Sequence, residues 1–157
     1  MVVVGAGISG IGQVELMEVL TGQRPRTAGT IRVDGRGYGA TRAEARSRRV
    51  RFLPEEPLKN ACAPRMSVAE NLAFRAFDGD GRRLWLDRRA MARRAADLIA
   101  GFDIRTRSPQ TPIRDLSGGN VQRAALAREL TGDVSLLVAS NPCFGLDFAA
   151  VRAIRDR

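Results

Sequence analysis

The sequence predicts an α/β fold in which a helical segment interrupts a sheet-forming core. Apolar runs with strand character lie near both ends of the chain, at Val2–Val4 and Val134–Ala139, and amphipathic helical segments occupy the middle. A glycine-rich loop follows the first of these strands and precedes a helix, which is typical of α/β proteins that bind phosphate groups. We therefore expect a core formed by residues 1–53 and 132–157, with residues 54–131 inserted as a helical part.

Length and composition favour a folded domain without a metal site. The chain has 157 residues, of which 44% are hydrophobic, so it can bury a core and is not a disordered tail. It contains no histidine, and its two cysteines, Cys62 and Cys143, are far apart, so we expect neither a zinc site nor a disulfide framework and favour a reducing cytoplasm. Because no apolar run approaches about 20 residues and no signal peptide is evident, we expect no direct membrane insertion.

The charge is strongly basic, with 26 Lys and Arg residues against 17 Asp and Glu residues and a net charge of +9. Such a balance can indicate a nucleic-acid partner. However, the arginines are dispersed in pairs, and a single Trp and a single Tyr provide no platform on which bases could stack. We therefore predict solvated helix faces, not a nucleic-acid-binding surface.

The N-terminal third is predicted to contain three strands and one helix. Val2–Val4 is a continuous β-branched run, as expected of a buried strand. Gln13–Leu20 is predicted to be a helix with Val14, Met17 and Val19 or Leu20 on its apolar side. A short strand at Thr30–Val33 is followed by the turn dipeptide Asp34-Gly35, and a third strand at Val50–Leu53 ends at Pro54.

The remaining elements are predicted from capping residues and prolines. Residues 55–65 contain Pro57 and Pro64 and are predicted to form an irregular loop. The next elements are a helix starting at Ser67, whose capping box is completed by Glu70, a helix from Asp87 to Ile99, a helix starting at Ser117, a strand at Val134–Ala139 stopped by Pro142, and a last helix at Phe148–Arg155.

The glycine-rich loop allows two interpretations. In the first, Gly5, Gly7 and Gly10 form the dinucleotide-binding fingerprint of flavin and nicotinamide enzymes, and Asp34 follows the second strand, where it could bind a ribose of FAD or NAD.

In the second interpretation, GISGIGQV is a degenerate Walker A loop. Gly7, Ser9, Gly10 and Gly12 keep the frame in which backbone groups approach phosphates closely, but Gln13 stands at the lysine position and Val14 at the hydroxyl position. A neutral amide supplies no full charge to the phosphates, and a valine cannot coordinate Mg²⁺.

A second candidate phosphate site lies in LSGGNVQRAALAREL, Leu116 to Leu130. Ser117, Gly118 and Gly119 open an amphipathic helix, and Gln122 follows one turn later. Small residues at a helix N-terminus leave backbone N–H groups uncovered where the helix dipole is positive, which favours binding of an anion.

These motifs together resemble those of ATP-binding cassette (ABC) ATPases, and in particular the C-terminal, degenerate nucleotide-binding half of importer ATPases for simple sugars or nucleosides. The resemblance extends over nearly the whole chain and includes GISGIGQVEL, FLPEEP, MSVAENLAF and LSGGNVQR. It implies a P-loop NTPase-like ABC ATPase core, incomplete in this chain, with an inserted helical subdomain. Residues 1–157 would then be a single partial ATP-binding domain. The resemblance also accounts for LSGGNVQR, a motif that is not expected in a dinucleotide-binding enzyme.

The resemblance also assigns positions at which this chain departs from the family pattern. Glu55 stands at the Q-loop glutamine, Ser140 and Asn141 stand at the Walker B aspartate and the catalytic glutamate, and Asp147 matches the D-loop. Without those groups the chain's own site is predicted to be catalytically silent, with no metal ligand of its own. The signature Ser117-Gly118-Gly119 and Gln122 would instead contact ATP held, with Mg²⁺, by a competent partner half.

The implied partners are a competent ABC ATPase half, in the same polypeptide or in a dimer, and transmembrane permease subunits. The implied location is the cytoplasm, peripheral on the inner face of the cell membrane. Three alternatives remain open from the sequence: a fragment of an oxidoreductase that binds FAD or NAD, a soluble ABC-type ATPase that acts on DNA or ribosomes, and a truncated product without activity.

Overall fold

The computed structural model describes residues 2–5, 12–75 and 87–140. Its centre is a parallel sheet in the order β1-β5-β4, formed by β1 (Val2–Gly5), β5 (Leu136–Ser140) and β4 (Val50–Leu53). Val138 in the middle of β5 pairs with Val3 on one side and with Phe52 on the other. Among the described residues, the strand that comes last in the sequence is therefore the central strand of this sheet.

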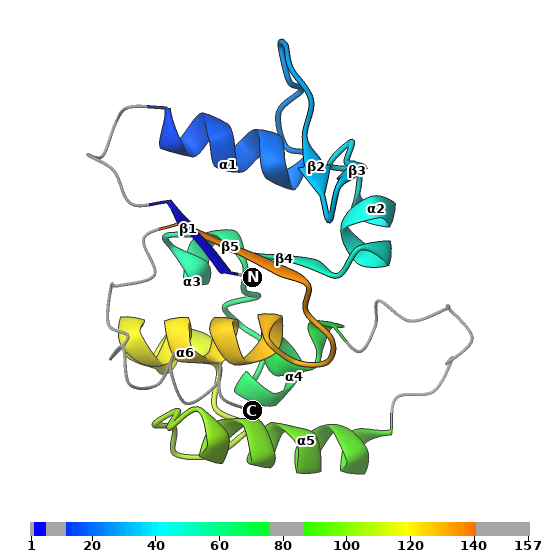
Figure 1. The fold of residues 1–157 in the computed structure, drawn as a ribbon. Coiled ribbons are helices and arrows are strands. Elements are labelled where there is room, and N and C mark those ends of the chain that lie inside the picture. Colours follow the sequence, from blue (N-terminus) through cyan, green and yellow to red (C-terminus); the bar gives the residue numbers. More distant parts are fainter. Residues whose placement is uncertain (1, 6–11, 76–86, 141–157) are drawn as a thin grey trace.

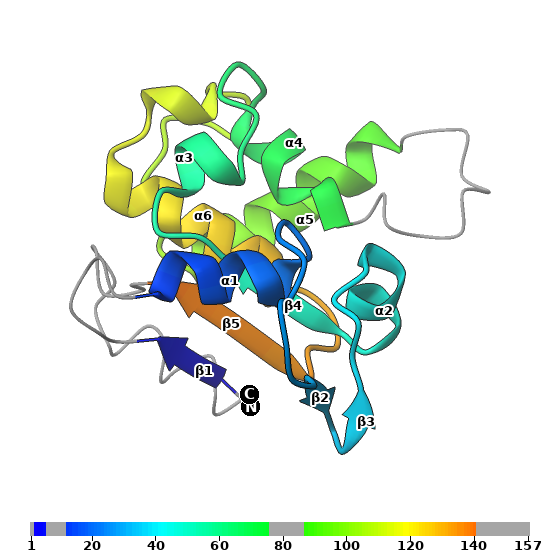
Figure 2. The ribbon, with the colours of Figure 1, turned by 90° about the horizontal axis from the view of Figure 1, so that it is seen from above.

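One helix covers each face of this sheet (Figure 1). α1 (Gln13–Thr21) lies on one face and α6 (Gly118–Glu129) on the other. Because the strands are parallel, their carboxyl ends lie at one edge, on the left in Figure 1, and both helices begin on that same side (Figures 1 and 2). The two helix N-termini and the end of β5 thus face the same side of the molecule.

A small antiparallel unit lies beside the sheet. It consists of β2 (Arg32–Val33), β3 (Arg36–Gly37) and α2 (Arg42–Ser47). Asp34 and Gly35 connect the two strands with φ angles of 51° and 73°, so the predicted turn is confirmed at a place where left-handed backbone is needed. The buried side chains of Val33, Tyr38, Ala40 and Val50 hold the unit against β4.

Short helices and one long helix pack around α6 as a helical layer, with α4 and α5 below α6 in Figure 1. These are α3 (Pro57–Asn60), α4 (Val68–Leu72), α5 (Arg88–Gly101) and the 3-10 turn η2 (Ile113–Asp115). Their core is a cluster of buried apolar residues that includes Val68, Leu72, Ile104 and Ile113.

α6 contributes to two cores at once. Val121, Ala124 and Ala127 pack into the helical layer, whereas Ala125 and Leu126 pack against the sheet. Small and medium apolar side chains on both of these faces explain how the helix can be covered on two sides. α6 therefore packs against both the sheet and the helical layer and lies between them.

Most predicted elements are confirmed, with shifted ends. Ser67 and Glu70 form the predicted capping box, and Asp87 accepts hydrogen bonds from the first turn of α5, which extends to Gly101. The differences are that α4 stops at Leu72 and that residues 55–65 contain the short helix α3. The structure also adds α2, β3 and η2, which the sequence analysis did not anticipate, and the helix predicted at Phe148–Arg155 lies outside the described residues.

Within the described ranges, no helix combines the length and the hydrophobicity that crossing a bilayer would require.

Candidate functional site

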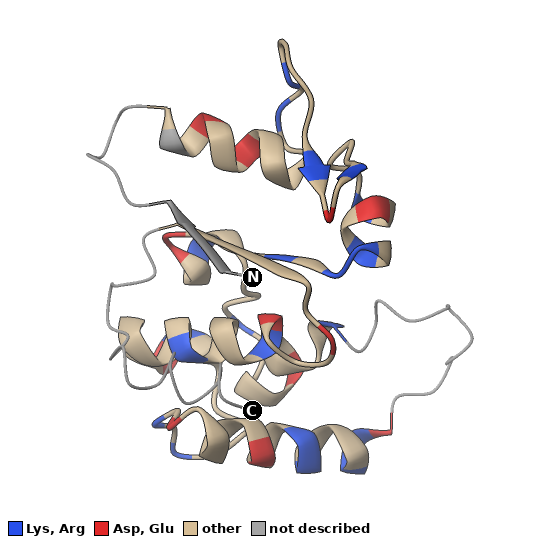
Figure 3. Cartoon of the chain, in the orientation of Figure 1, with Lys and Arg blue, Asp and Glu red and all other residues tan. Residues whose placement is uncertain are grey.

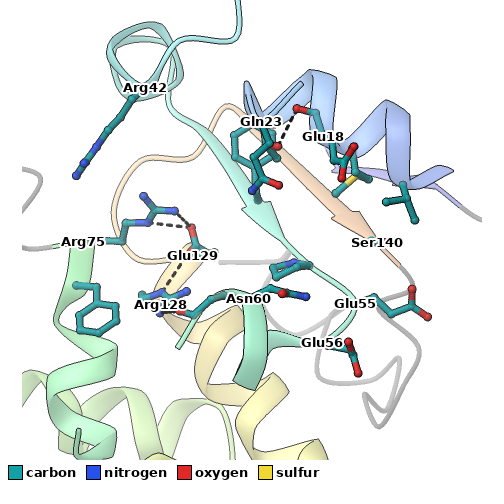
Figure 4. Close-up of a pocket in the computed structure, with 17 residues that line it drawn as sticks. Glu18, Gln23, Arg42, Glu55, Glu56, Asn60, Arg75, Arg128, Glu129 and Ser140 are labelled. Carbon is teal, nitrogen blue, oxygen red and sulfur yellow. Dashed lines mark hydrogen bonds and ion pairs between the residues drawn. The ribbon is translucent and has the colours of Figure 1, made fainter. Parts of the chain in front are cut away.

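A cavity of about 1220 Å³ runs beside the edge strand β4 (Figure 4). Its wall combines residues from α1, α2, β4, α3, α6, β5 and the connecting segments. The residues that line it are Val14, Met17, Glu18, Thr21, Gln23, Arg42, Phe52, Pro54, Glu55, Glu56, Asn60, Ala61, Phe74, Arg75, Arg128, Glu129 and Ser140.

The start of α1 borders this cavity. Gly12 is the N-cap, with a left-handed φ of 69° and no side-chain capping bond. Val14 in the first turn is 58% exposed and lines the cavity. A valine there offers no oxygen to a metal ion. Gln13 is the first residue of α1, and the predicted loop residues Gly7, Ser9 and Gly10 lie outside the described part of the chain.

Two other predicted positions converge on the same cavity. Glu55 is exposed just after β4, and Ser140 ends β5, so both lie at the carboxyl edge of the sheet. The structure therefore brings Val14, Glu55 and Ser140, which are far apart in sequence, to the wall of one cavity; Figure 4 labels Glu55 and Ser140. Asn141 and Asp147 are outside the described residues. A role for these positions in nucleotide binding stays a prediction.

The predicted signature is found at the exposed start of α6. Ser117 is the N-cap and is exposed, as is Gly118, and Gly119 is half-buried. The Ser117 side chain makes no capping bond, so it does not cover the N–H groups of the first turn. An uncovered helix start with a free N-terminal turn is suited to an anion.

Asn120, which the sequence analysis did not single out, organises this helix start. Its Nδ2 donates to Ser117 Oγ at 2.9 Å, and its Oδ1 accepts from the backbone N–H of Arg105 at 2.8 Å. Because Oγ accepts from Asn120, its own hydrogen must be directed to another acceptor. The Ser117 hydroxyl hydrogen is therefore not used in this bond and is available to another acceptor.

Gln122 does not share that exposed face. It lies one turn into α6 and is 3% exposed, among the buried residues of the helix. Its predicted contact with a nucleotide stays a prediction, and the structure does not bring it to the surface that Ser117 and Gly118 form.

The far end of α6 carries a cluster of buried charges. Glu129, the last residue of the helix, is 0% exposed and Arg128 is 4% exposed. Arg128 Nε donates to Glu129 Oε1 at 2.9 Å, and Arg75 Nε donates to Glu129 Oε2 at 2.9 Å (Figure 4). Burial raises the pKa of the neighbouring Cys62 thiol, although Arg128 opposes that shift, so the thiol stays protonated near neutral pH.

Other arginines of the described residues lie at the surface of the helical layer. Arg88, Arg89, Arg93 and Arg94 are exposed on α5, as predicted, and Figure 3 shows basic residues on several elements of the chain. Asp34, the predicted ribose ligand of a dinucleotide site, lies in the turn of the separate β2–β3 unit and not at the end of a strand of the parallel sheet. This geometry does not fit the dinucleotide interpretation.

Comparison with known proteins agrees with the motifs. A family model described as "ABC transporter" matches residues 2–143. The chain is 41% identical over 158 residues to the glucose import ATP-binding protein TsgD13 of Haloferax volcanii, covering 96% of this chain and 28% of that protein. It is 37% identical to the ribose import ATP-binding protein RbsA 1 of Rubrobacter xylanophilus, covering 92% of this chain and 30% of that protein. It is also 31% identical to the guanosine import ATP-binding protein NupO of Bacillus subtilis, covering 97% and 30%.

Solved structures show the same fold. A dimeric post-hydrolysis state of the ATP-binding cassette MJ0796, bound to ADP and Pi, superposes with a TM-score of 0.73 over 99% of this chain and 66% of that chain, at 20% identity. The chain spans less than a third of the length of the three curated relatives named above. These comparisons give no support to the oxidoreductase interpretation.

Proposed function

The chain belongs to the ABC transporter ATP-binding family, and from that premise we propose that it is a nucleotide-binding half of an importer for simple sugars or nucleosides. In this proposal its own nucleotide site is degenerate, and its signature completes an ATP site on a partner half. The importer assignment is supported by the relatives, which are named as glucose, ribose and guanosine import ATP-binding proteins.

The proposed degeneracy of its own site follows from residue chemistry. Gln13 and Val14 stand where a lysine and a hydroxyl would bind phosphate and Mg²⁺, and Ser140 stands where a carboxylate would be needed. Transfer of a phosphoryl group depends mostly on electrostatic stabilisation, and these side chains supply no full charge. We expect weak ATP binding and no hydrolysis at this site.

The observation that carries the proposal is the exposed start of α6. Ser117 and Gly118 are accessible, the first turn lacks a side-chain cap, and the Ser117 hydroxyl, which accepts from Asn120, keeps its own hydrogen for another acceptor. These features suit the γ-phosphate of an ATP molecule, with its Mg²⁺, bound to another polypeptide surface.

The proposed assembly contains a competent ABC ATPase half, in the same polypeptide or as a second chain, and transmembrane permease subunits. It would place this chain in the cytoplasm, peripheral to the inner face of the membrane. We also propose that residues 1–53 and 132–157 form the ATPase core and residues 54–131 the helical subdomain, with α6 packed against both parts.

Substitution of Ser117 tests this function directly. In the full-length transporter, Ser117→Arg should reduce transport-coupled ATP hydrolysis at least about 100-fold, because a bulky cation replaces a donor and blocks the helix start. A matched control is Ser47→Arg, which places the same side chain at an exposed serine of α2. Hydrolysis that survives Ser117→Arg at the level of the control would refute the proposed role of the signature.

A further inference from the structure

Glu129 occupies a position that is electrostatically unfavourable without partners. It is the last residue of α6, where the negative end of the helix dipole opposes a carboxylate, and it is 0% exposed. A buried charge is tolerated only when it is paired and hydrogen-bonded. Because water does not reach Glu129, its charge must be stabilised by neighbouring protein groups.

Those contacts tie the end of α6 to two other segments. Arg75, which follows α4 in the chain, donates through Nε and Nη2 to Glu129 Oε2. Arg128 binds the other carboxylate oxygen, donates to the carbonyl of Ala61 at 2.7 Å, and lies over the ring of Phe74 at 5.4 Å. The connection between Arg75 and Glu129 joins residues 54 positions apart, so it links separate elements (Figure 4).

α6 is a continuous helix between this cluster and the signature. It runs for 12 residues from Gly118 to Glu129, and beyond Gly119 it contains no glycine or proline at which it could bend. Its middle is held between the two cores. We therefore expect this short helix to move as one rigid body. A shift of its Glu129 end would then also shift its Ser117 end.

We propose that Glu129 is a positioning residue, and that its bridge to Arg75 sets the placement of the signature through α6. This inference rests on the proposed function, because it assumes that Ser117 must meet a partner-bound ATP. A misplacement of about 1 Å in such a site can reduce the rate about 100-fold, so a small shift of the helix is sufficient.

Arg75→Met in the full-length transporter is the decisive variant. The Arg75 side chain is 31% exposed, and its removal leaves the pair between Arg128 and Glu129 intact, so the chain should still fold. We expect kcat for ATP hydrolysis per folded transporter to fall about tenfold, and KM for ATP to change less than about twofold. Arg75→Lys, which keeps the charge, should recover part of kcat.

Two controls separate positioning from stability. Arg49→Met removes an exposed ion pair with Asp133 that does not involve α6, and it should leave kcat unchanged. The double variant Arg75→Met with Glu129→Gln should be no slower than Glu129→Gln alone, because both changes break the same bridge.

The inference is overturned if Arg75→Met lowers the melting temperature but leaves kcat per folded transporter within about twofold of the parent. It is also overturned if the fold reductions in kcat caused by Arg75→Met and by Glu129→Gln multiply in the double variant. Ser117→Arg distinguishes this failure from a failure of the proposed function: if Ser117→Arg abolishes hydrolysis and Arg75→Met does not affect it, only the role of Glu129 is refuted.

Discussion

At the scale of single residues, two asparagine side chains each bind more than one neighbouring group at once. Asn71, 2% exposed, accepts from the N–H of Ala63 and donates to the carbonyls of Ala63, Met66 and Ser67. Asn120 plays a comparable part at the surface, between Arg105 and Ser117. An amide side chain suits both places because it donates and accepts at the same time.

A prediction at this scale concerns the direction of the Ser117 hydroxyl. Asn120→Ala removes the donor to Oγ and should reduce ATP hydrolysis of the transporter about fivefold to tenfold, since a neutral hydrogen bond contributes about 1 kcal/mol. Asn120→Asp keeps an acceptor for Arg105 but would accept from Ser117 as well, turning the hydroxyl inward. It should therefore be slower than Asn120→Ala, and an aspartate variant that is the faster of the two would contradict the proposed orientation.

The sequence predicted Ser117 but neither Asn120 as its support nor the bridge to Glu129. A motif identifies residues that act together when they are close in sequence, as in LSGG. Asn120 acts through Arg105, 15 positions away, and Arg75 acts on Glu129 across 54 positions. Those pairings depend on how helices pack, which local patterns do not encode.

At the scale of elements, local signals predicted helix starts well. The capping box at Ser67 and Glu70 is formed, with Ser67 N–H donating to Glu70 Oε2 at 2.8 Å and Ser67 Oγ accepting from Glu70 N–H. The same pattern, Thr41-x-x-Glu44, also begins α2, so this helix could have been predicted from the sequence. In contrast, α3 has only four residues, and its packing against α6 must supply most of its stability.

The Ser67–Glu70 box gives a prediction with a definite pH dependence. Hydrogen bonds from the Ser67 backbone and side chain lower the pKa of Glu70 below its usual 4.5. A lowered pKa in the folded state means that the carboxylate stabilises the fold above about pH 4.5, and that this contribution is lost as the pH falls. Glu70→Gln should therefore lower the free energy of unfolding more at neutral pH than at about pH 3.

Urea unfolding of the chain at the two pH values measures this difference. Ser67→Ala should cost about 0.5–2 kcal/mol at neutral pH, as for other N-caps. The exposed Asp97 in α5 provides a control, because Asp97→Asn removes a carboxylate without disturbing a cap. An effect of Glu70→Gln that is as large in acid as at neutral pH would show that the carboxylate charge is not responsible.

At the scale of the whole molecule, the chain's own nucleotide site can be tested by thermal stability. A ligand stabilises a fold by RT ln(1 + [L]/Kd), so a Kd weaker than about 1 mM contributes less than about 0.4 kcal/mol at 1 mM ATP. We expect Mg²⁺ and 1 mM ATP to raise the melting temperature of the chain by less than about 2 °C. A micromolar Kd would raise it by about 8 °C or more, and this outcome would refute a degenerate site.

The α/β class and the family were predicted from the sequence and are confirmed. The separation into a sheet and a helical layer was also anticipated, but the sequence did not reveal that α6 packs into both. The sequence did not predict the cavity, because the residues that line it are scattered along the chain between Val14 and Ser140. Only the folded arrangement of the chain brings them together.

The strand order has a consequence for the way this protein is made. β5 joins β1 to β4, and its Val138 pairs with Val3 and Phe52. During translation, neither flanking strand meets its neighbour until residue 140 has left the ribosome. The residues of α4, α5 and α6 are synthesised before β5, so these helices can pack together first. Until β5 is made, β1 and β4 lack the strand with which they pair in this sheet. A pause in synthesis before β5 would therefore expose those edges longest, and the nascent chain would then be most in need of a chaperone.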